Sequence, residues 1–375
     1  MKKPKIIAFY LPHFHEIAEN NERWGEGFTD WICIKKTAAW FMDHRQPRIP
    51  YKNNYYDLSK FDVQEWQSEL ALKYGISGFC YYHYWFNGKL LYEKPMEMMR
   101  INPIIEIPFC INWVNESFTG FQNGGKQEII ITQEEDSEEE WEKHFKYLLP
   151  FFKDRRYIRV DNKPVFLIYN YPSIKNGDAK IQYFQKLAKE NNLAGLHIVS
   201  TLHGHSPQYT NSPFIDASAR LEPMYTLKHR LSLYLRVKFF LKRKIIGGFY
   251  AKAFGVLMPK LRNIDYDEIN HRISKELHFK SEKPIYNGAF VGWDNTPRCG
   301  IDALIVDGDM PGSFGFYLGK ALDTAIKNNS EFVFLNAWNG WADGAYLEPD
   351  IDNRYDYLEA VKQQLMKRGL YEEVS

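Results

Sequence analysis

Eight short apolar runs are spaced along the chain, and most are separated by segments with helical periodicity. The runs that we expect to form buried strands are residues 5–11, 76–83, 104–112, 164–170, 197–202, 214–219, 284–290 and 332–338. Apolar side chains recur at helical spacing in residues 62–74, 137–152, 178–192, 266–277 and 316–329. Continuous apolar strands that alternate with helices are typical of a parallel sheet covered on both faces.

Eight such units predict an α/β fold, a (β/α)8 TIM barrel formed as a single domain by residues 1–375. A doubly wound sheet is the alternative, but no GxGxxG follows the first strand. Several strands are followed at once by polar and aromatic residues, as in PHFH, YHYWFN, NWVNESF, GWDNTPR and NAWNGWAD. Because a barrel gathers the C-terminal ends of its strands at one face, we expect a deep, aromatic, hydrogen-bonding cleft there.

One segment departs from this pattern by its charge. Residues 223–264 contain no acidic residue, and their basic residues are Lys228, Arg230, Arg236, Lys238, Lys242, Arg243, Lys244, Lys252, Lys260 and Arg262. We expect residues 222–283 to form a basic, aromatic-rich insertion within the barrel domain. It is either a helical insertion with a solvated basic face or, through residues 227–262, an element that contacts an anionic membrane or a lipid phosphate.

Composition narrows the class of protein. Hydrophobic residues make up 45% and charged residues 25%, as in soluble globular proteins, and a net charge of +1 predicts no nucleic-acid partner. The cysteines form no CxxC pair, which favours reduced thiols. The first apolar run is shorter than the ~7–15 residues of a signal-peptide core, and no run approaches the ~20 residues of a membrane span. We therefore expect a cytoplasmic protein, or one peripheral to the inner membrane.

Two patterns could hold a metal ion. His13 and His15 form one H-x-H pair and His203 and His205 another, but neither has clustered Cys or carboxylate residues beside it. Asp307 and Asp309 form a D-x-D within VDGDMPG, which is typical of a turn. There is no P-loop and no nucleophile elbow. The sequence therefore predicts no metal and no cofactor.

Longer motifs carry a family resemblance. FYLPHFH, NERWGEGFTDW, QPRIPYK, YGISGFCYYHYWFNGK, PFCINWVNES, YIRVDNKPVFLIY, GWDNTPR and NAWNGWADGAYLEPD resemble the WbsX family of polysaccharide-biosynthesis proteins, often described as glycosyltransferases. That family is similar to glycoside hydrolase family 99, the endo-acting α-mannosidases with a (β/α)8 barrel. The resemblance spans residues 5–365 and is weakest across 204–283. It implies an enzyme that acts at glycosidic bonds.

The resemblance also identifies where this chain departs from its relatives. In the hydrolases a Glu-Trp-X-Glu motif after the last strand supplies a base and an acid, and WbsX members usually read Asn-Glu-Trp-Ala-Glu-Gly. Here Gly340 stands at the base position and Asp343 at the acid position. Glycosidic chemistry ordinarily needs two carboxyl groups. We expect Asp343 and Glu116 to be the catalytic pair, and Glu26, Asp30, Asp294 and Glu348 are further carboxylates near the strand ends.

Aromatic and amide side chains around the cleft suit a sugar, because rings can stack on its C–H faces and amides can bond its hydroxyls. Arg298 could hold a phosphate or carboxylate by a bidentate contact. For each aromatic residue, core packing is the competing interpretation. The residues that we expect to bind substrate are Tyr10, His13, Trp24, Glu26, Trp31, Tyr82, His83, Tyr84, Trp85, Asn112, Trp113, Asn115, Trp293, Asp294, Asn295, Arg298, Asn336, Trp338, Asn339, Trp341 and Glu348.

Three functions remain open at this point. The leading hypothesis is a glycosyltransferase of cell-surface polysaccharide assembly (O-antigen or capsule), whose partners are an oligosaccharide or lipid-linked glycan and a sugar donor. The second is an endo-acting glycoside hydrolase of the family 99 type with a rearranged catalytic pair. The third is a catalytically silent glycan-binding protein.

Overall fold

A closed barrel of parallel strands forms the centre of the molecule. The computed structural model describes residues 2–120, 129–133, 137–206, 211–241, 263–277, 281–300 and 303–373. The barrel strands pair in a closed ring in the order β1 (Lys5–Tyr10), β2 (Gly78–Phe86), β4 (Phe109–Trp113), β8 (Lys163–Ile168), β9 (His197–Leu202), β10 (Ala217–Arg220), β12 (Ile285–Phe290) and β15 (Phe332–Asn336). The predicted (β/α)8 barrel is confirmed, and each strand overlaps its predicted run.

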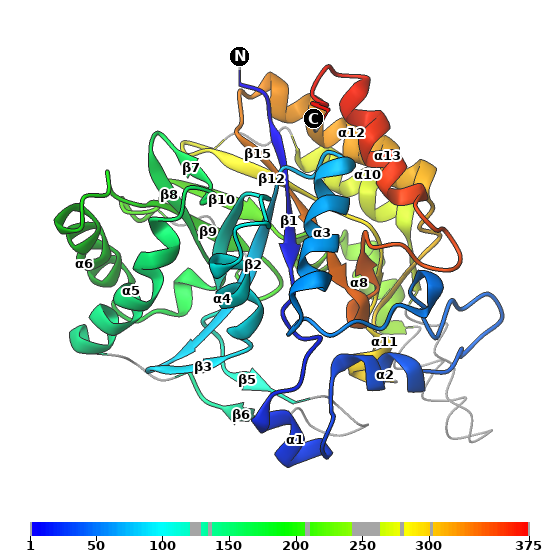
Figure 1. The fold of residues 1–375 in the computed structure, drawn as a ribbon. Helices are drawn as coiled ribbons and strands as arrows, with labels where there is room; N and C mark the ends of the chain where they lie inside the picture. The colour runs from blue at the N-terminus through cyan, green and yellow to red at the C-terminus, as the bar shows by residue number, and fades with distance from the viewer. Residues whose placement is uncertain are drawn as a thin grey trace.

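Helices surround this ring (Figure 1). The five predicted helices are confirmed as α3 (Phe61–Lys73), α5 (Glu138–Phe152), α6 (Gly177–Glu190), α10 (Tyr266–Glu276) and α12 (Pro311–Lys327), and α4 (Lys94–Ile101) and α13 (Asp356–Met366) join them. Local chemistry explains their starts. Ser137 caps α5 by accepting a hydrogen bond from the Glu140 amide, and acidic residues fill the first turn, where they suit the helix dipole.

Small elements gather where the barrel strands end, at the lower side of Figure 1, to which β1 points. They are α1 (Ala18–Trp24), α2 (Asp30–Lys36), η1 (Tyr51–Asn53), β3 (Lys89–Leu91), β5 (Phe118–Thr119), β6 (Ile129–Ile131), η2 (Tyr171–Ser173), α7 (Met224–His229), α8 (Leu233–Phe240), β13 (Trp293–Asp294), α11 (Thr296–Cys299), β16 (Asn339–Gly340), η6 (Trp341–Asp343) and β17 (Ala345–Tyr346). β11 (Asn263–Asp265) and β14 (Ile305–Asp307) form a three-stranded sheet with β13, and β7 (Arg159–Val160) pairs with β8.

The strand register decides which side chains face the barrel interior. Phe9 on β1 contacts Tyr82 on β2 and Phe334 on β15, with ring centroids 5.7 and 5.5 Å apart, so these three rings point inward. Asn112 on β4 lies beside Tyr82 and shares its face. Because side chains alternate along a strand, their neighbours point outward into the layer between barrel and helices, where most of the apolar core lies.

Two strand boundaries differ from the prediction for backbone reasons. β4 begins at Phe109 rather than 104, because Pro103 and Pro108 lack the amide hydrogen that a ladder needs. β2 extends to Phe86 and pairs with β3. Asn87 and Gly88 between them have φ of 47° and 87°, as a tight hairpin turn requires.

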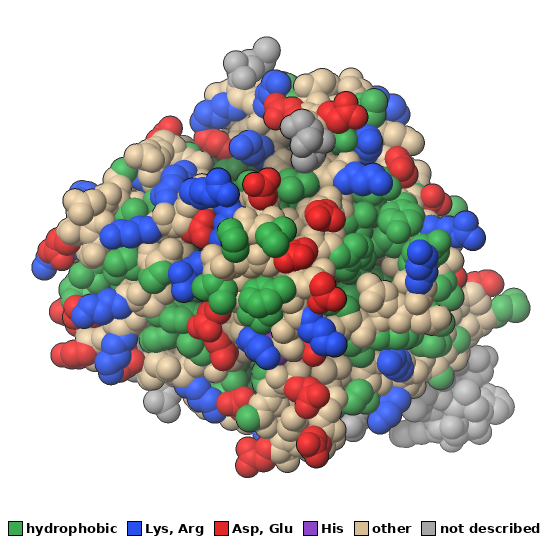
Figure 2. Space-filling view, in the orientation of Figure 1, with side chains coloured by type: hydrophobic (Ala, Val, Ile, Leu, Met, Phe, Trp, Pro, Cys, Tyr) green, Lys and Arg blue, Asp and Glu red, His purple; other side chains and the backbone are tan. Residues whose placement is uncertain are grey.

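Of the basic segment the structure describes only part. α7 and α8 carry Lys228, Arg236 and Lys238, whereas residues 242–262, with six of the ten basic side chains, lie outside the described residues. That 222–283 is an insertion within one domain stays a prediction. Among the described helices, none is both long and apolar enough to cross a membrane. On the face shown in Figure 2, basic and acidic side chains are interspersed.

Candidate active site

A chain of charged groups crosses the C-terminal face of the barrel and ends at Asp343. Nε of Arg298 lies 3.2 Å from Oδ1 of Asp343. A terminal nitrogen of the same guanidinium donates to Oδ2 of Asp30 at 2.9 Å and lies 3.1 Å from Nδ1 of His13. The other ring nitrogen of His13 lies 2.8 Å from the Tyr84 hydroxyl. The end of β2 and the segments that follow β1, β12 and β15 are thereby joined around one carboxylate.

The surroundings of Asp343 favour its protonated form. Burial raises the pKa of Asp343, the positive charge of Arg298 offsets part of this rise, and the nearby charge of Asp30 raises the pKa further. Burial alone would lower the pKa of Arg298, but the charges of Asp343 and Asp30 outweigh it and raise it. Arg298 therefore stays charged, while Asp343 is a carboxyl group suited to donate a proton.

The surroundings of Glu116, which follows β4, favour its ionised form. Its Oε1 accepts a hydrogen bond from Nδ2 of Asn170 at 2.8 Å and lies 3.4 Å from Nδ1 of His205. Burial by itself would raise the pKa of Glu116, but the hydrogen bond from His205, the charge of His203 and the bond from Asn170 together lower it. The same contact raises the pKa of His205. Glu116 is therefore suited to accept a proton.

Two tyrosines lie close enough to both carboxylates to feel their charges. Burial raises the pKa of both Tyr84 and Tyr169, and the charges of Asp343 and Glu116 each raise it further at both rings. Both carboxylates therefore lie within electrostatic reach of the same two rings, in one cleft. Tyr169 also contacts His203, with ring centroids 3.9 Å apart.

The floor of the cleft is aromatic and amide-rich. Tyr82 is half-buried, and its ring lies 6.0 Å from that of Tyr169. Asn112 is fully buried beside it, and neither of its amide atoms has a hydrogen-bond partner among the described residues. Nδ2 of Asn336 donates to the backbone oxygen of Glu222 at 2.9 Å. An unsatisfied buried amide is costly, so Asn112 is a group that a polar ligand or water would stabilise.

Gly340 cannot be replaced by a larger residue without moving backbone. A Cβ at Gly340 would lie 2.5 Å from the carbonyl oxygen of Ala345, its partner in the β16–β17 pair. The adjacent Asn339 fastens this hairpin to β1, because its side-chain amide both donates to and accepts from the backbone of Leu11. The space that a glutamate would need at position 340 is therefore filled by the chain itself.

Four residues expected to bind substrate lie on the outer face of the barrel instead. The Tyr10 hydroxyl donates to Gln67 on α3. His83 and Trp85 contact His144 on α5, the first through ring nitrogens 2.9 Å apart and the second by stacking. Trp113 lies under the ammonium of Lys180 on α6. These positions correct the expectation for Tyr10, His83, Trp85 and Trp113, which alternate along their strands with the residues that face inward.

Another group of predicted residues holds the surrounding loops together. Buried Trp31 donates to the backbone oxygen of Tyr56. Asp294 accepts hydrogen bonds from Gln46 and Thr296 and pairs with His44. Burial would raise the pKa of Asp294, but the contact with His44, the charge of Arg48 and these hydrogen bonds together lower it to about 2. Asn115, Asn295 and Trp341 make hydrogen bonds within the protein, and the Trp338 ring packs against Phe79. Trp293 is buried on β13.

Three predicted residues lie away from the centre of the cleft. Trp24 is half-buried on α1 and stacks on Phe28, and Glu26 is exposed in the loop that follows. Glu348 is buried and accepts hydrogen bonds from Tyr56, Gln67 and Trp341, each at 2.6 Å. Burial raises the pKa of Glu348 to about 7.

Several residues of the cleft were missed in the sequence. Tyr169 and Asn170 follow β8, and Glu222 follows β10, where burial raises its pKa to about 7. His203 and His205 follow β9, and the sequence pattern presents them only as candidate metal ligands. The sequences LIYNY and TLHGH carry the same signal as the motifs that were recognised, an apolar strand followed directly by polar and aromatic residues.

Within the described residues, Glu116, His203 and His205 form a group whose ligand atoms lie within 4.8 Å of one another. Oε1 of Glu116 is already hydrogen-bonded by Asn170 and His205, so the group is satisfied as a hydrogen-bonded carboxylate, and we assign no metal to it. The two aspartates of the D-x-D pattern have different surroundings. Asp309 forms an ion pair with Arg45, and Asp307 is exposed at the end of β14.

Comparisons with known proteins agree with this architecture. Residues 6–361 match the model of the family described as "Glycosyltransferase WbsX". The "Uncharacterized protein WxcX" of Xanthomonas campestris pv. campestris (strain B100) is 28% identical over 365 residues, which cover 96% of this chain and 50% of that protein. The same protein of strain ATCC 33913 matches equally. The chain thus spans about half the length of the curated relatives it matches.

Two solved structures share the fold. A "Glycoside hydrolase-like protein" aligns with a TM-score of 0.61 at 13% identity, covering 97% of this chain and 94% of its own. The GH99 endo-alpha-mannosidase from Bacteroides thetaiotaomicron aligns with a TM-score of 0.57 at 13% identity, covering 99% of both chains. At this identity the likeness shows the fold alone. Because the family model matches residues 6–361, the chain belongs to the glycosyltransferase WbsX family.

Proposed function

We propose that the chain is a glycosyltransferase of cell-surface polysaccharide assembly, with Asp343 as acid and Glu116 as base. The observation that carries this proposal is the opposite shift of two carboxyl pKa values in one cleft: that of Asp343 is raised and that of Glu116 is lowered. Environments that push the pKa values of two titratable groups apart mark an acid and a base. Family membership supports the glycan as substrate.

The proposed reaction forms a bond from an acceptor hydroxyl oxygen to the anomeric carbon and breaks the bond from that carbon to the leaving oxygen. Glu116, held ionised by Asn170 and His205, takes the proton of the acceptor hydroxyl. Asp343 gives its proton to the leaving oxygen, so protons balance. Arg298 would stabilise the Asp343 carboxylate that remains.

The cleft floor supports recognition of a sugar ring. Tyr82 and Tyr169 offer partly exposed ring faces for the C–H surface of a sugar. Asn112 offers an amide without a partner among the described side chains, which suits a sugar hydroxyl. Aromatic rings combined with an amide can orient a small polar ligand that carries no charge, such as a neutral sugar.

A lipid-linked glycan as partner is supported by the exposed face of α8. Leu233, Val237 and Leu241 follow one another at four-residue spacing and are 77%, 46% and 44% exposed, and Arg236 and Lys238 beside them are exposed as well. Apolar and basic side chains on one short helix suit the interface of an anionic membrane. We propose that this face holds the enzyme at the inner membrane.

Vesicle co-sedimentation tests the membrane part. The chain should pellet with phosphatidylcholine vesicles that contain phosphatidylglycerol and much less with phosphatidylcholine alone. The double variant Leu233→Glu, Val237→Glu should lose this binding, whereas Ile104→Glu, a change at an exposed apolar residue elsewhere, should keep it. Equal binding of all three proteins would contradict the proposed membrane contact of α8.

A mass-spectrometric screen tests the reaction. Purified protein is incubated in heavy-oxygen water with sugar donors and glycan acceptors taken from the native surface polysaccharide. Transfer gives an acceptor larger by one sugar and without the label. A labelled free sugar would instead establish a glycoside hydrolase, and binding without any product would establish a silent glycan-binding protein.

A further inference from the structure

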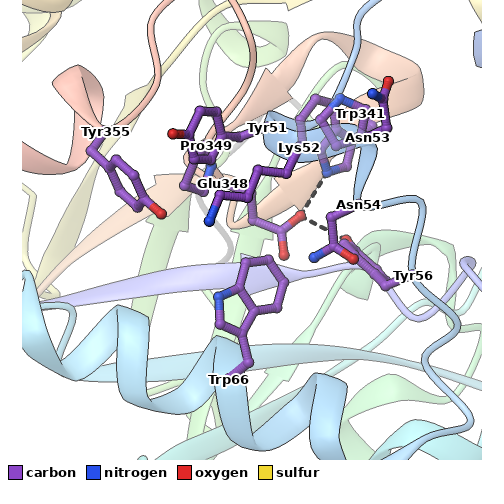
Figure 3. A pocket seen from close by; sticks show the side chains of 11 residues that line it. Tyr51, Lys52, Asn53, Asn54, Tyr56, Trp66, Trp341, Glu348, Pro349 and Tyr355 are labelled. Atoms are coloured by element: carbon purple, nitrogen blue, oxygen red, sulfur yellow. Dashed lines mark hydrogen bonds between the residues drawn. The ribbon is translucent and has the colours of Figure 1, made fainter.

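A cavity lies between the loop that precedes α3, α3 itself and the segment that precedes α13 (Figure 3). Its volume is about 440 Å³, within the ~300–1,000 Å³ range of small-ligand sites. We call it the α3–α13 pocket. It is lined by Pro50, Tyr51, Lys52, Asn53, Asn54, Tyr56, Trp66, Trp341, Glu348, Pro349 and Tyr355. Neither Asp343 nor Glu116 lines it.

The walls of the α3–α13 pocket combine rings with amides. Tyr51, Trp66 and Tyr355 are half-buried, so each keeps part of its ring open to the pocket. Figure 3 shows Trp66 and Tyr355 pointing toward Glu348 from two sides. Figure 2 shows hydrophobic side chains gathered on the surface between α3 and α13. The rings can stack on the C–H faces of a sugar, and the exposed amides of Asn53 and Asn54 beside them can bond its hydroxyls. Sites that bind sugars combine groups of these two kinds.

The floor of the pocket is rigid and internally satisfied. Glu348 accepts three hydrogen bonds at 2.6 Å, from the Tyr56 hydroxyl, Nε1 of Trp341 and Nε2 of Gln67. One face of Trp341 is covered by Tyr346, with ring centroids 3.7 Å apart. Since these donors already occupy the carboxylate of Glu348, it shapes the floor and does not need a ligand.

The mouth of the pocket carries one positive charge. Lys52 is exposed and makes no ion pair with any residue that the structure describes, and its ammonium lies 5.7 Å from the Tyr51 ring centroid. Lys52 has a φ of 57°, a left-handed conformation that lysine seldom adopts and that concentrates at functional sites; Asn53 beside it has a φ of 56°, which asparagine adopts readily. An unpaired cation beside open rings favours a ligand with a negative group.

We propose that the α3–α13 pocket is a second carbohydrate site, which binds a sugar ring that carries a carboxylate, with the ring against Trp66 and Tyr355 and the carboxylate at Lys52. The inference rests on the proposed function only for its choice of a glycan as ligand. Because Trp341 in its wall and Asp343 in the cleft belong to the same short helix η6, the site would hold an acidic polysaccharide next to the catalytic cleft.

The test is fluorine NMR of protein labelled with 5-fluorotryptophan, titrated with cellobiouronic acid and with its neutral counterpart cellobiose. The Trp66 signal, assigned with Trp66→Phe, should shift with the acidic disaccharide, and binding should be tighter than for cellobiose by up to about five-fold. Lys52→Gln should remove this preference, and Lys60→Gln, at an exposed lysine nearby, should keep it.

The proposal that the α3–α13 pocket binds carbohydrate is overturned if neither disaccharide shifts the Trp66 signal. Its preference for an acidic sugar is overturned if both bind equally or if Lys52→Gln changes nothing. The readout needs no turnover and should persist in Asp343→Asn. Failure of this proposal is therefore distinguishable from failure of the proposed reaction.

Discussion

Nε of Arg298 lies 3.2 Å from Oδ1 of Asp343, so the carboxylate that remains from the motif after the last strand is paired with a cation that also holds Asp30. A pair of this kind does two things. It keeps the pKa of Asp343 from rising as far as burial would take it, and it holds the carboxylate beside Arg298 and Asp30.

Arg298→Gln should move the alkaline limb of the activity profile to higher pH. The charge of Arg298 lowers the pKa of Asp343, so its removal raises that pKa and keeps the acid protonated to a higher pH. The rate itself should fall by about 100-fold, because Asp343 is no longer positioned. The measurement is kcat/KM against pH. Arg298→Lys keeps the charge and should leave the limb in place, and an identical limb in Arg298→Gln would contradict this role.

His205→Ala should act on the opposite limb. The hydrogen bond from His205 lowers the pKa of Glu116, so without it the base becomes protonated at a higher pH. Activity on the acid side should be lost at a higher pH than in the wild type. His271→Ala, at an exposed histidine on α10, is the matched control and should change nothing. If the acid limb of His205→Ala were unchanged, Glu116 would not be the base that sets it.

Gly340→Ala should destabilise the fold, and Gly340→Glu should not create a hydrolase. A Cβ there meets the Ala345 carbonyl at 2.5 Å, so the hairpin must move at a cost of about 1–3 kcal/mol in the free energy of unfolding. Gly312→Ala on α12 meets nothing within 4 Å and should be neutral or stabilising. Denaturant unfolding compares the two. Full stability of Gly340→Ala would show that the space is open.

Glu348 should make stability depend on pH. Its pKa is raised from 4.5 to about 7 in the folded protein, so the native state binds the proton more tightly than the unfolded chain. The stabilisation is full below pH 4.5 and is lost as pH rises through about 7. Gln cannot titrate, so the unfolding free energy of the wild type should fall relative to that of Glu348→Gln as pH rises from about 4.5 through about 7. A difference that stays constant across the window would contradict the burial of this charge.

Removal of divalent ions should leave activity intact. Glu116, His203 and His205 could converge on one ion, but Glu116 is already hydrogen-bonded. Dialysis against a chelator should therefore not slow product formation. Loss of activity that a single divalent cation restores would instead identify this group as a metal centre.

The alternation of apolar strands and helices was enough to predict the barrel, because parallel strands buried on both faces leave a distinct pattern. The direction of individual side chains was not predictable. His83 and Tyr84 are adjacent and equally suited to a sugar, yet one contacts α5 and the other His13 in the cleft. Which of two alternating faces points inward depends on the register between strands.

The last-strand motif shows the same limit. The sequence revealed that a carboxylate is absent at Gly340, but only the β16–β17 pairing shows that the Ala345 carbonyl fills its space. Likewise, the ion pair between Arg298 and Asp343 joins segments that follow different strands, and no spacing along the chain predicts it.

The most direct test of the central claim is the transfer assay run on wild type, Asp343→Asn, Glu116→Gln and the double variant, with Glu282→Gln at an exposed site as control. We predict that each catalytic variant loses about 100-fold or more in rate. The double variant should lose little beyond the worse single one, because the two groups act in one step. Wild-type rates in either single variant would contradict the assignment of Asp343 and Glu116 as acid and base.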